Sequence, residues 1–491
     1  MANVNSELQG KILTFYFYWW RCINEENEEK FHLHPPNEYL QDPTFFNTLN
    51  KEWHKAELLD MVDAKVDIAL PVFWGNPHFI DSWSIPGLTA MKQALEELAQ
   101  NNVAVPKVGM FFDTTCLNLM ENNQATLDYI IDNNNPMPPP INLSIPEDRD
   151  KFYGVFRSFF LEVGINWPHL ARVGGRPLVL IWSPHSPFIV QHSYSPDTFL
   201  EVENRFNAEF GVKPYICLEY YWIRPENANW DSMYRLPEMY PIFGWNGGTN
   251  PNAVYFGDLI SVIPGYDDGK IVVDRENGNL YRNAWEAIID SGQPKPILLE
   301  TWNEFFEGSC LCNTQEFGRQ YIDLSAHFVR KLRAPDWGVA YSHNIPTLMK
   351  AGAEATATVT ITNVGKRDIV EPVLRVVDDP GNFCQGVGEF PLPGGRFEFE
   401  QERAVTINLK APSQAGSFPL TLQVFRKYKT LSTLRTGTVV NTPALYLPVG
   451  QPLSVNIRVT NLAVVIPQPR PIIKPGIISE IRTLEEHKTL K

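Results

Sequence analysis

The chain has 491 residues, of which 44% are hydrophobic and 20% charged, with a formal net charge of −14. That length suits two or three domains with sizeable cores. The acidic balance argues against nucleic acid and anionic membrane surfaces as partners, because both bind to a basic face.

The first apolar run, KILTFYFYWW, predicts a β-strand over residues 11–20. Such a run is too short to span a membrane, and no basic segment followed by a leucine-rich leader precedes it. We therefore expect no membrane span and a cytoplasmic protein. The alternative is a secreted protein whose leader has been trimmed or whose export is non-classical.

Apolar runs and helical patterns alternate through the first two thirds of the chain. Strands are expected at 11–20, 66–75, 105–115, 176–184, 213–222, 240–247, 258–266 and 295–303. Helices are expected at 46–64, 87–102, 148–164, 195–210 and 316–333. Continuous apolar runs are typical of parallel strands that are buried on both faces. We predict an α/β fold, a (β/α)8 TIM barrel over residues 1–337, irregular between 222 and 258, where the gaps are too short for full helices.

The pattern changes after residue 337 to short alternating runs that are rich in β-branched residues. These runs lie at 353–363, 373–377, 404–409, 418–425 and 453–459, with turn clusters such as DDPG and PGG between them. They predict an accessory, Ig-like antiparallel β-sandwich over residues 338–463. A Pro-rich C-terminal tail is predicted at 464–491.

Acidic, amide and aromatic side chains gather where the predicted barrel strands end, which is where barrel enzymes carry their active sites. This mixture, with few basic groups, suits a neutral polyhydroxylated ligand. Carboxylates and amides bond hydroxyl groups, and aromatic rings stack on the C–H faces of sugars. The candidate substrate-binding residues are Tyr18, Trp19, Trp74, Asp113, Glu219, Tyr221, Trp245, Tyr266, Asp267, Trp302 and Asn303.

Phosphate and metal chemistry are not expected at this rim. It has no glycine-rich loop and no cluster of Lys and Arg that would hold a phosphate. The close histidine pair, His32 and His34, lies in a polar loop and is read as surface. We predict no cofactor, no metal and a carbohydrate substrate as partner, and the pattern indicates no particular oligomeric state.

The stretch LLETWNEFFEGS places Glu304 and Glu307 three residues apart, beside Trp302 and two phenylalanines. Cleavage of a glycosidic bond needs two carboxyl groups, one protonated and one ionised. Mutual repulsion and aromatic neighbours raise the pKa of such a pair, so that one carboxyl stays protonated near neutral pH. The structural alternative is that one glutamate caps the following helix or pairs with Arg319. We predict that both are catalytic.

The segment TWNEFFEGS resembles glycoside hydrolase family 99, in which Asn-Glu-Trp-His-Glu-Gly follows the last barrel strand. The similarity runs from residue 258 to 333, through ISVIPGYDD, LYRNAWEAI, the motif itself and EFGRQYIDL. The resemblance implies a retaining enzyme that cleaves α-mannosidic bonds inside chains. It also implies that Glu304 is a base on the sugar 2-hydroxyl, giving an epoxide-like intermediate, and that Glu307 is the acid/base on the glycosidic oxygen.

The motif departs from that family at two places. Phe305 and Phe306 stand where family 99 has Trp and His, and Gly308-Ser309-Cys310 replaces Gly-Thr-Gln. We predict a retaining glycoside hydrolase acting on an oligo- or polysaccharide. The alternatives are a non-catalytic carbohydrate-binding or structural, assembly-forming protein on a glycosidase-like barrel, and a lyase or transglycosylase that uses the same acids.

Overall fold

The computed structural model describes residues 6–19, 45–75, 83–119, 140–183, 189–245, 257–293, 295–428, 431–433, 439–441 and 445–461. The chain divides into two compact units, Met1–Arg333 and Ala334–Lys491. The tail predicted at 464–491 and the pair His32 and His34 lie outside the described residues.

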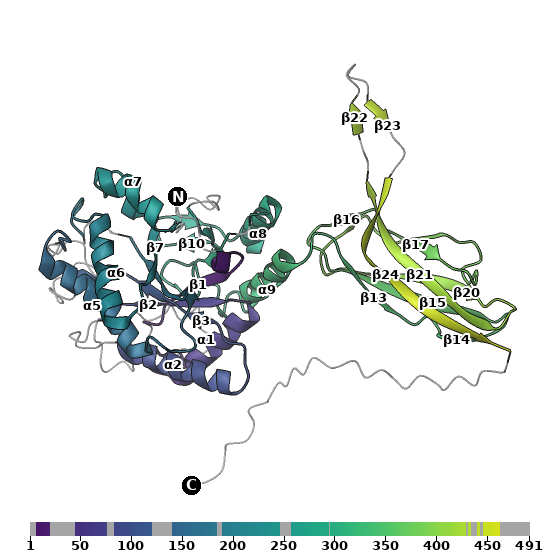
Figure 1. Ribbon diagram of the computed structural model, residues 1–491, viewed down its shortest axis with the longest axis horizontal. Coiled ribbons are helices and arrows are strands. Elements are labelled where there is room, and N and C mark those ends of the chain that lie inside the picture. The colour runs from purple at the N-terminus through teal and green to yellow at the C-terminus, as the bar shows by residue number, and fades with distance from the viewer. Residues whose placement is uncertain are drawn as a thin grey trace, which may run out of the picture. The chain divides into compact units, whose positions relative to one another are not determined.

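The first unit is a barrel of eight parallel strands (Figure 1) in the order β8-β7-β6-β4-β2-β1-β12-β9. The strands are β1 (Ile12–Tyr16), β2 (Ile68–Phe73), β4 (Met110–Phe112), β6 (Arg176–Ile181), β7 (Tyr215–Glu219), β8 (Ile242–Phe243), β9 (Ile260–Val262) and β12 (Ile297–Leu299). Strands β8 and β9 stand at the two ends of this order, and hydrogen bonds link them. The Asp258 amide, just before β9, donates to the Ile242 carbonyl of β8 at 2.6 Å, and the Ile242 amide donates to the Asp258 carboxylate at 3.0 Å. The predicted (β/α)8 barrel is confirmed.

Helices surround this sheet (Figure 1). They are α1 (Lys51–Asp63), α2 (Ser84–Gln100), α3 (Cys116–Leu119), α5 (Pro146–Val163), α6 (Pro196–Phe210), α7 (Trp230–Met239), α8 (Asn279–Ser291) and α9 (Gln320–Arg333). The sequence around α6 shows how a boundary is set. Ser195 and Thr198 form a capping box, Pro196 occupies the first turn, and Gly211 ends the helix at φ 73°.

Helix α7 corrects the prediction that the gaps between 222 and 258 are too short for a full helix. Its ten residues begin after Asn229, whose side chain accepts a hydrogen bond from the Ser232 amide, and Pro237 lies inside the helix. A proline in a helix interior is normally unfavourable, which weakens the sequence signal there. The strand that follows, β8, has only two residues, so the expected irregularity lies in this strand.

Short elements complete the barrel unit. They are β3 (Lys107–Val108), β5 (Arg172–Val173), β10 (Tyr266–Asp267), β11 (Val272–Val273), η1 (Ser6–Leu8), η3 (Tyr220–Ile223) and η4 (Glu276–Gly278). Strands β10 and β11 pair antiparallel, so a small hairpin follows β9 on the way to α8.

The side chains of β1 alternate between the inside of the barrel and its helix layer. The ring of Phe15 lies 4.1 Å from that of Phe111 on β4. The hydroxyl of Tyr16, in contrast, lies 2.8 Å from Nδ1 of His54 on α1. All five residues of the strand are buried, because each face of a parallel strand meets an apolar layer. This alternation determines which residues after the strand can face a central pocket.

The second unit consists mainly of two sheets, as predicted for a β-sandwich. One sheet has the order β13-β15-β20 and the other β14-β24-β21-β17-β18. The strands of this unit are β13 (Val339–His343), β14 (Leu348–Lys350), β15 (Glu354–Asn363), β16 (Ile369–Val370), β17 (Val373–Asp378), β18 (Glu389–Pro391), β19 (Arg396–Phe397), β20 (Glu402–Lys410), β21 (Gly416–Tyr428), β22 (Leu431–Thr433), β23 (Val439–Asn441) and β24 (Leu445–Thr460). Pairing within the two sheets is antiparallel except between β14 and β24.

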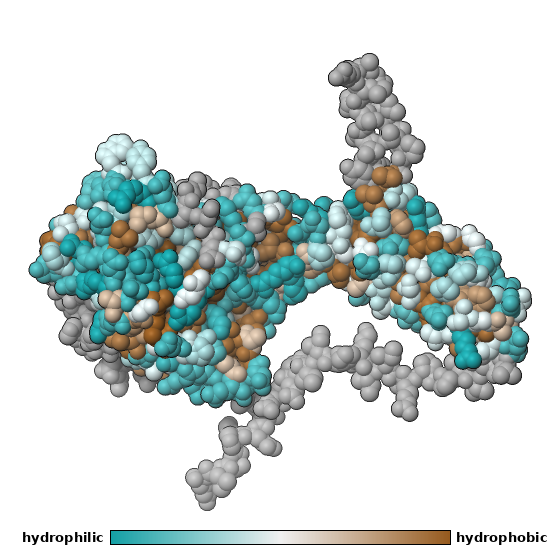
Figure 2. Space-filling view, viewed as in Figure 1, coloured by the Kyte–Doolittle hydropathy of each residue, from teal (hydrophilic) through white to brown (hydrophobic). Residues whose placement is uncertain are grey.

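The surface of the first unit is mainly hydrophilic on the face that Figure 2 shows, with smaller hydrophobic areas between the helices. Within the described ranges, no helix is long and apolar enough to cross a membrane.

Candidate active site

A small pocket of about 90 Å³ lies where several barrel strands end. Its lining comes from the ends of β1, β4, β6, β8 and β12, which are far apart in the sequence. The lining residues are Phe17, Trp19, Phe111, Asp113, Trp182, Trp245, Glu304 and Glu307. Five of them, Trp19, Asp113, Trp245, Glu304 and Glu307, are predicted site residues. The pocket therefore combines three carboxyl groups with aromatic rings.

The segment after β12 is fixed to β1 and the residues that follow it by two hydrogen bonds. The Phe17 amide donates to Oδ1 of Asn303 at 2.8 Å, and the Trp302 amide donates to the Phe15 carbonyl at 2.9 Å. Asn303 is fully buried and does not line the pocket. Its side chain instead holds together the two segments that supply Trp19 and the glutamates.

Glu304 is almost completely buried, with 4% of its surface exposed. Its amide donates to Thr301 Oγ1 at 3.0 Å, and its Oε1 accepts a hydrogen bond from the Phe306 amide at 3.0 Å. Burial raises the pKa of Glu304 well above its ordinary value, and the nearby charge of Glu307 raises it further. The hydrogen bond from Phe306 opposes this shift, because it stabilises the ionised form.

Glu307 is more accessible than Glu304 and has a free acceptor. Its Oε2 is buried and has no hydrogen-bond partner among the described residues. Burial, followed by the charges of Asp268 and Asp113, raises the pKa of Glu307 to about 7. Two carboxyls with raised pKa values in one pocket favour a state in which the pair keeps a proton near neutral pH.

Asp113 is the third carboxyl of the pocket and is held firmly. Trp74 Nε1 donates to Oδ2 at 2.7 Å, and the amide and hydroxyl of Thr115 donate to Oδ1 at 3.0 and 2.8 Å. Hydrogen bonds of this kind favour a carboxylate. Trp74 therefore lies behind the pocket wall, with its ring 5.4 Å from that of Trp19.

Two predicted binding residues face the helix layer and not the pocket. The hydroxyl of Tyr18 donates to the Ser84 carbonyl at 2.8 Å, at the start of α2. Trp302 Nε1 donates to Glu57 on α1 at 2.5 Å. Both side chains are fully buried. The prediction that Tyr18 lines the cleft is therefore wrong, and Trp302 also lies outside the pocket. Alternate residues of an extended segment point to opposite sides, so the neighbours of pocket residues face the helices.

Glu219 and Tyr221 also lie outside the lining of this pocket. Burial raises the pKa of Glu219 to about 8, an effect that is partly opposed by hydrogen bonds from the Tyr221 and Trp245 amides. The carboxyl group is 2.7 Å from the Tyr221 amide. The ring of Tyr221 is 37% exposed and lies 4.0 Å from the guanidinium of Arg224. The expectation that Glu219 faces the same cleft as the motif pair is not met.

Tyr266 and Asp267, on strand β10, line a second and larger pocket of about 290 Å³. The Asp267 amide donates to the Glu307 carbonyl at 2.8 Å, so the two pockets are adjacent. Burial raises the pKa of Tyr266, and the charge of Glu307 is the next largest cause. The prediction that Asp267 shares the cleft of the motif pair is therefore corrected to a neighbouring pocket.

The structural alternative for the motif glutamates does not hold. Arg319 forms ion pairs with Asp60 and Asp63 on and near the end of α1. Helix α9 begins at Gln320, well beyond the motif, and neither glutamate caps it. The burial of Glu304 and Glu307 is thus not compensated by a basic partner among the described residues.

Sequence reasoning missed Phe17, Phe111 and Trp182 as parts of the pocket. Their signal was the period-two alternation of the strands, since Phe15, Phe17 and Trp19 share one face. The ring of Phe17 lies 4.9 Å from that of Trp19 and 6.3 Å from that of Phe111. In the part of the chain that the structure describes, no group of three His, Cys, Asp or Glu side chains is arranged to hold a metal ion.

Glu307 gives the stability of the protein a pH dependence that can be measured. Its pKa is raised from 4.5 to about 7 in the folded state, so the folded protein holds a proton that the unfolded chain releases. The contribution of Glu307 to stability is therefore greatest below pH 4.5 and falls as the pH rises towards 7, by at most about 3 kcal/mol. We expect Glu307→Gln to gain stability relative to the wild type between pH 5 and pH 8, measured by urea unfolding.

The control for this measurement is Glu238→Gln, which changes an exposed carboxyl on α7. The unfolding free energy of Glu238→Gln should follow that of the wild type across the same pH range. Parallel curves for Glu307→Gln and the wild type would contradict a buried, protonated Glu307.

The fold and the site define a (β/α)8-barrel protein with paired glutamates at the carboxyl ends of its strands. Residues 25–357 match the profile of the family described as a domain of unknown function, DUF5010, and the chain belongs to this family. No protein in a search of curated proteins matched the chain.

Several experimental structures resemble parts of the chain. Two structures of the GH99 endo-alpha-mannosidase from Bacteroides thetaiotaomicron align with 15% identity and a TM-score of 0.43. One is a complex with bis-tris-propane and the other, without it, covers 67% of this chain and 99% of that protein. The CARDB domain of the PF1109 protein from Pyrococcus furiosus aligns with 17% identity and a TM-score of 0.17, covering 26% of this chain and 90% of that domain.

Proposed function

We propose that this protein is a retaining glycoside hydrolase that acts on an oligo- or polysaccharide. The observation that carries the proposal is the pair Glu304 and Glu307 in one small aromatic pocket, both with raised pKa values. Such a pair can supply one protonated and one ionised carboxyl at the same pH.

The roles of the two glutamates follow those that the family 99 motif implies. Burial raises the pKa of Glu304 well above its ordinary value and a hydrogen bond from the Phe306 amide opposes that shift, so its role as the base rests on the motif and not on its pKa. Glu307 keeps an unbonded Oε2 beside the pocket, and its pKa of about 7 suits a group that gives and takes a proton near neutral pH. We assign Glu304 as the base and Glu307 as the acid/base.

The reaction then proceeds in two displacements at the sugar C1. Glu304 takes the proton of the 2-hydroxyl, O2 bonds to C1, and the glycosidic bond breaks as Glu307 protonates the leaving oxygen. Water next attacks C1 and the C1–O2 bond breaks. Glu307 takes the proton of the water, and Glu304 returns its proton to O2. Two inversions at C1 give overall retention of configuration.

The aromatic lining supports a sugar ligand. Trp19, Trp182 and Trp245 belong to the wall of the pocket, and the rings of Trp182 and Trp245 lie 6.0 Å apart at 73°. Flat rings offer apolar surfaces to the C–H faces of a sugar. Asp113, held by Trp74 and Thr115, presents a fixed acceptor for hydroxyl groups.

A screen of α- and β-linked aryl glycosides and polysaccharides tests the proposal. We expect release of reducing ends from at least one substrate, with the first-formed anomer retained by proton NMR. The double variant Glu304→Gln/Glu307→Gln should release none. Binding of a polysaccharide without any release by the wild type would favour the carbohydrate-binding alternative, and release by the double variant would refute the assignment.

A further inference from the structure

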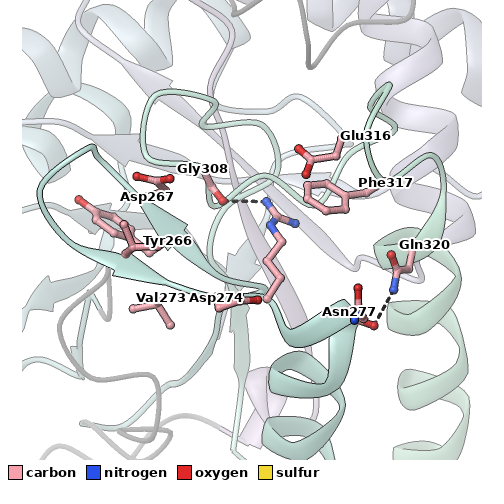
Figure 3. Close-up of a pocket in the computed structure, with 11 residues that line it drawn as sticks. Tyr266, Asp267, Val273, Asp274, Asn277, Gly308, Glu316, Phe317 and Gln320 are labelled. Carbon is pink, nitrogen blue, oxygen red and sulfur yellow. Dashed lines mark hydrogen bonds between the residues drawn. The ribbon is translucent and has the colours of Figure 1, made fainter.

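The second pocket, drawn in Figure 3, includes Gly308, which follows Glu307 in the loop that carries the glutamate pair. Figure 3 shows Tyr266 and Asp267 on one side of it and Glu316 and Phe317 on the opposite side. These come from the hairpin β10–β11 and from the segment before α9. The polar and aromatic groups that line the pocket include Asp267, Asp274, Asn277, Glu316, Phe317 and Gln320.

Hydrogen bonds fix the hairpin beside this pocket and join two of its walls. In the hairpin, Oδ1 of Asp268 accepts from the amides of Lys270 and Ile271 at 2.8 and 2.7 Å. Across the base of the pocket, Gln320 Nε2 donates to the Asn277 carbonyl at 3.0 Å. The pocket is therefore formed before a ligand enters, which lowers the entropic cost of binding.

Arg275 joins the second pocket to the loop that carries Glu304 and Glu307. Its Nη2 donates to the carbonyls of Gly308 and Cys310 at 2.7 and 3.0 Å. Its guanidinium lies 4.2 Å from the ring centre of Phe317 and 4.7 Å from that of Tyr321. Its Nη1 is buried and has no hydrogen-bond partner among the described residues. The other groups that line the pocket offer carboxylates, amides and rings.

The two pockets flank one peptide bond. Glu307 lines the first and Gly308 lines the second, and the Cα atoms of neighbouring residues are only about 3.8 Å apart. Gly308 has φ +55°, and a Cβ at this position would lie 3.2 Å from the Asp267 amide nitrogen. The close approach of the hairpin to the loop therefore brings the second pocket within reach of a ligand chain that passes the glutamates.

The chemistry of the lining selects a neutral, hydroxyl-rich ligand. The lining holds three carboxylates, Asp267, Asp274 and Glu316, against the one guanidinium of Arg275, and this excess of negative charge disfavours anions such as phosphate. Within the described ranges, no set of His, Cys, Asp and Glu side chains is arranged to bind a metal ion. No described residue is hydrogen-bonded to the exposed Glu316 carboxylate, so its oxygens can accept sugar hydroxyls beside the Phe317 ring.

We propose that this second pocket is a subsite that binds a further sugar unit of the same chain whose glycosidic bond lies at Glu304 and Glu307. The proposal rests on the glycoside hydrolase function proposed above and makes the substrate an oligosaccharide that extends past the bond being broken. Glu316 accepts hydroxyl groups of that unit, and Phe317 supplies an apolar face.

The test measures affinity against chain length in the full chain carrying Glu307→Gln. The probes are end-labelled oligosaccharides of one to six units from α-mannan, α-glucan, β-glucan and galactan, followed by fluorescence anisotropy. Adding Glu316→Ala should weaken binding of the longer oligosaccharides about tenfold, as expected for one lost charge-assisted hydrogen bond. It should leave the shortest binding member unchanged. Adding Glu316→Gln should keep most of the affinity, because the amide oxygen still accepts.

The matched control adds Glu238→Ala, an exposed carboxyl on α7 outside both pockets. It should bind every probe as the parent does. Equal length dependence in the parent and in Glu316→Ala would refute the subsite while leaving the proposed function standing. Absence of binding by the whole panel, together with no release in the substrate screen, would refute both.

Discussion

Replacing either motif glutamate by glutamine is expected to lower kcat by roughly 10²–10⁴-fold, since proton transfer in the transition state contributes about that much. KM should change little, because the isosteric amide keeps the shape and polarity of the pocket wall. The loss follows from geometry: Glu304 and Glu307 share one pocket and no described basic residue neutralises them. Steady-state kinetics on the substrate found by the screen would measure it.

The pH profile separates catalysis from a structural role. The rate should fall as the pH rises through about 7, because Glu307 then loses the proton that the leaving oxygen needs. The acid limb belongs to the pair as a whole, since the two carboxyls titrate together. Each glutamine variant should lose one limb. Glu238→Gln is the control with an unchanged profile, and full activity in both motif variants would show that the acids are not catalytic.

Replacing Trp302 by alanine is expected to destabilise the barrel by about 3–5 kcal/mol, the usual cost of removing a large buried aromatic side chain. Trp302 is fully buried, and its indole N–H donates to Glu57. Burial raises the pKa of Glu57 to about 8, and the bond from Trp302 counteracts that effect. The urea midpoint of the barrel transition, multiplied by its slope, gives the change in unfolding free energy.

The neighbouring Phe306 provides a matched comparison. Its side chain is 45% exposed, so Phe306→Ala should cost less than about 1 kcal/mol. Trp302→Phe should lie between the two, because it keeps most of the volume but removes the donor to Glu57. An equal cost for Trp302→Ala and Phe306→Ala would mean that the outward orientation of Trp302 is wrong.

The sequence was sufficient to predict the order of barrel strands because each strand is a continuous apolar run. It was also sufficient to bring Trp19, Asp113 and Trp245 to the same pocket as the glutamates, since all of them follow strands whose carboxyl ends meet at one edge. These inferences depend on which strand each residue follows and not on the exact strand end, since the strand predicted at 11–20 ends at Tyr16 and the one predicted at 295–303 ends at Leu299.

The direction in which each side chain points was harder to predict. Tyr18 and Trp302 follow strand ends as Trp19 and Asn303 do, yet they face α2 and α1 because of a one-residue difference in register. In a strand buried on both faces, aromatic residues suit either side, so hydrophobicity does not reveal the register. Asp267 lies outside the central pocket for a different reason: it belongs to the hairpin β10–β11, which extends beyond the end of β9.

The hydrogen bond from Phe17 to Asn303 also means that one side of β1 acquires its neighbour late during synthesis. Ile12 bonds to Asp67, 55 residues later, whereas Phe17 waits for Asn303, 286 residues later. At ribosomal speeds, that delay is on the order of 15 to 60 s. During this time one edge of an aromatic strand, ILTFY, has no neighbour and can pair with other chains. We expect the nascent protein to be prone to such pairing until the last barrel strand emerges, and the loop that carries Glu304 and Glu307 is among the last parts of the barrel to form.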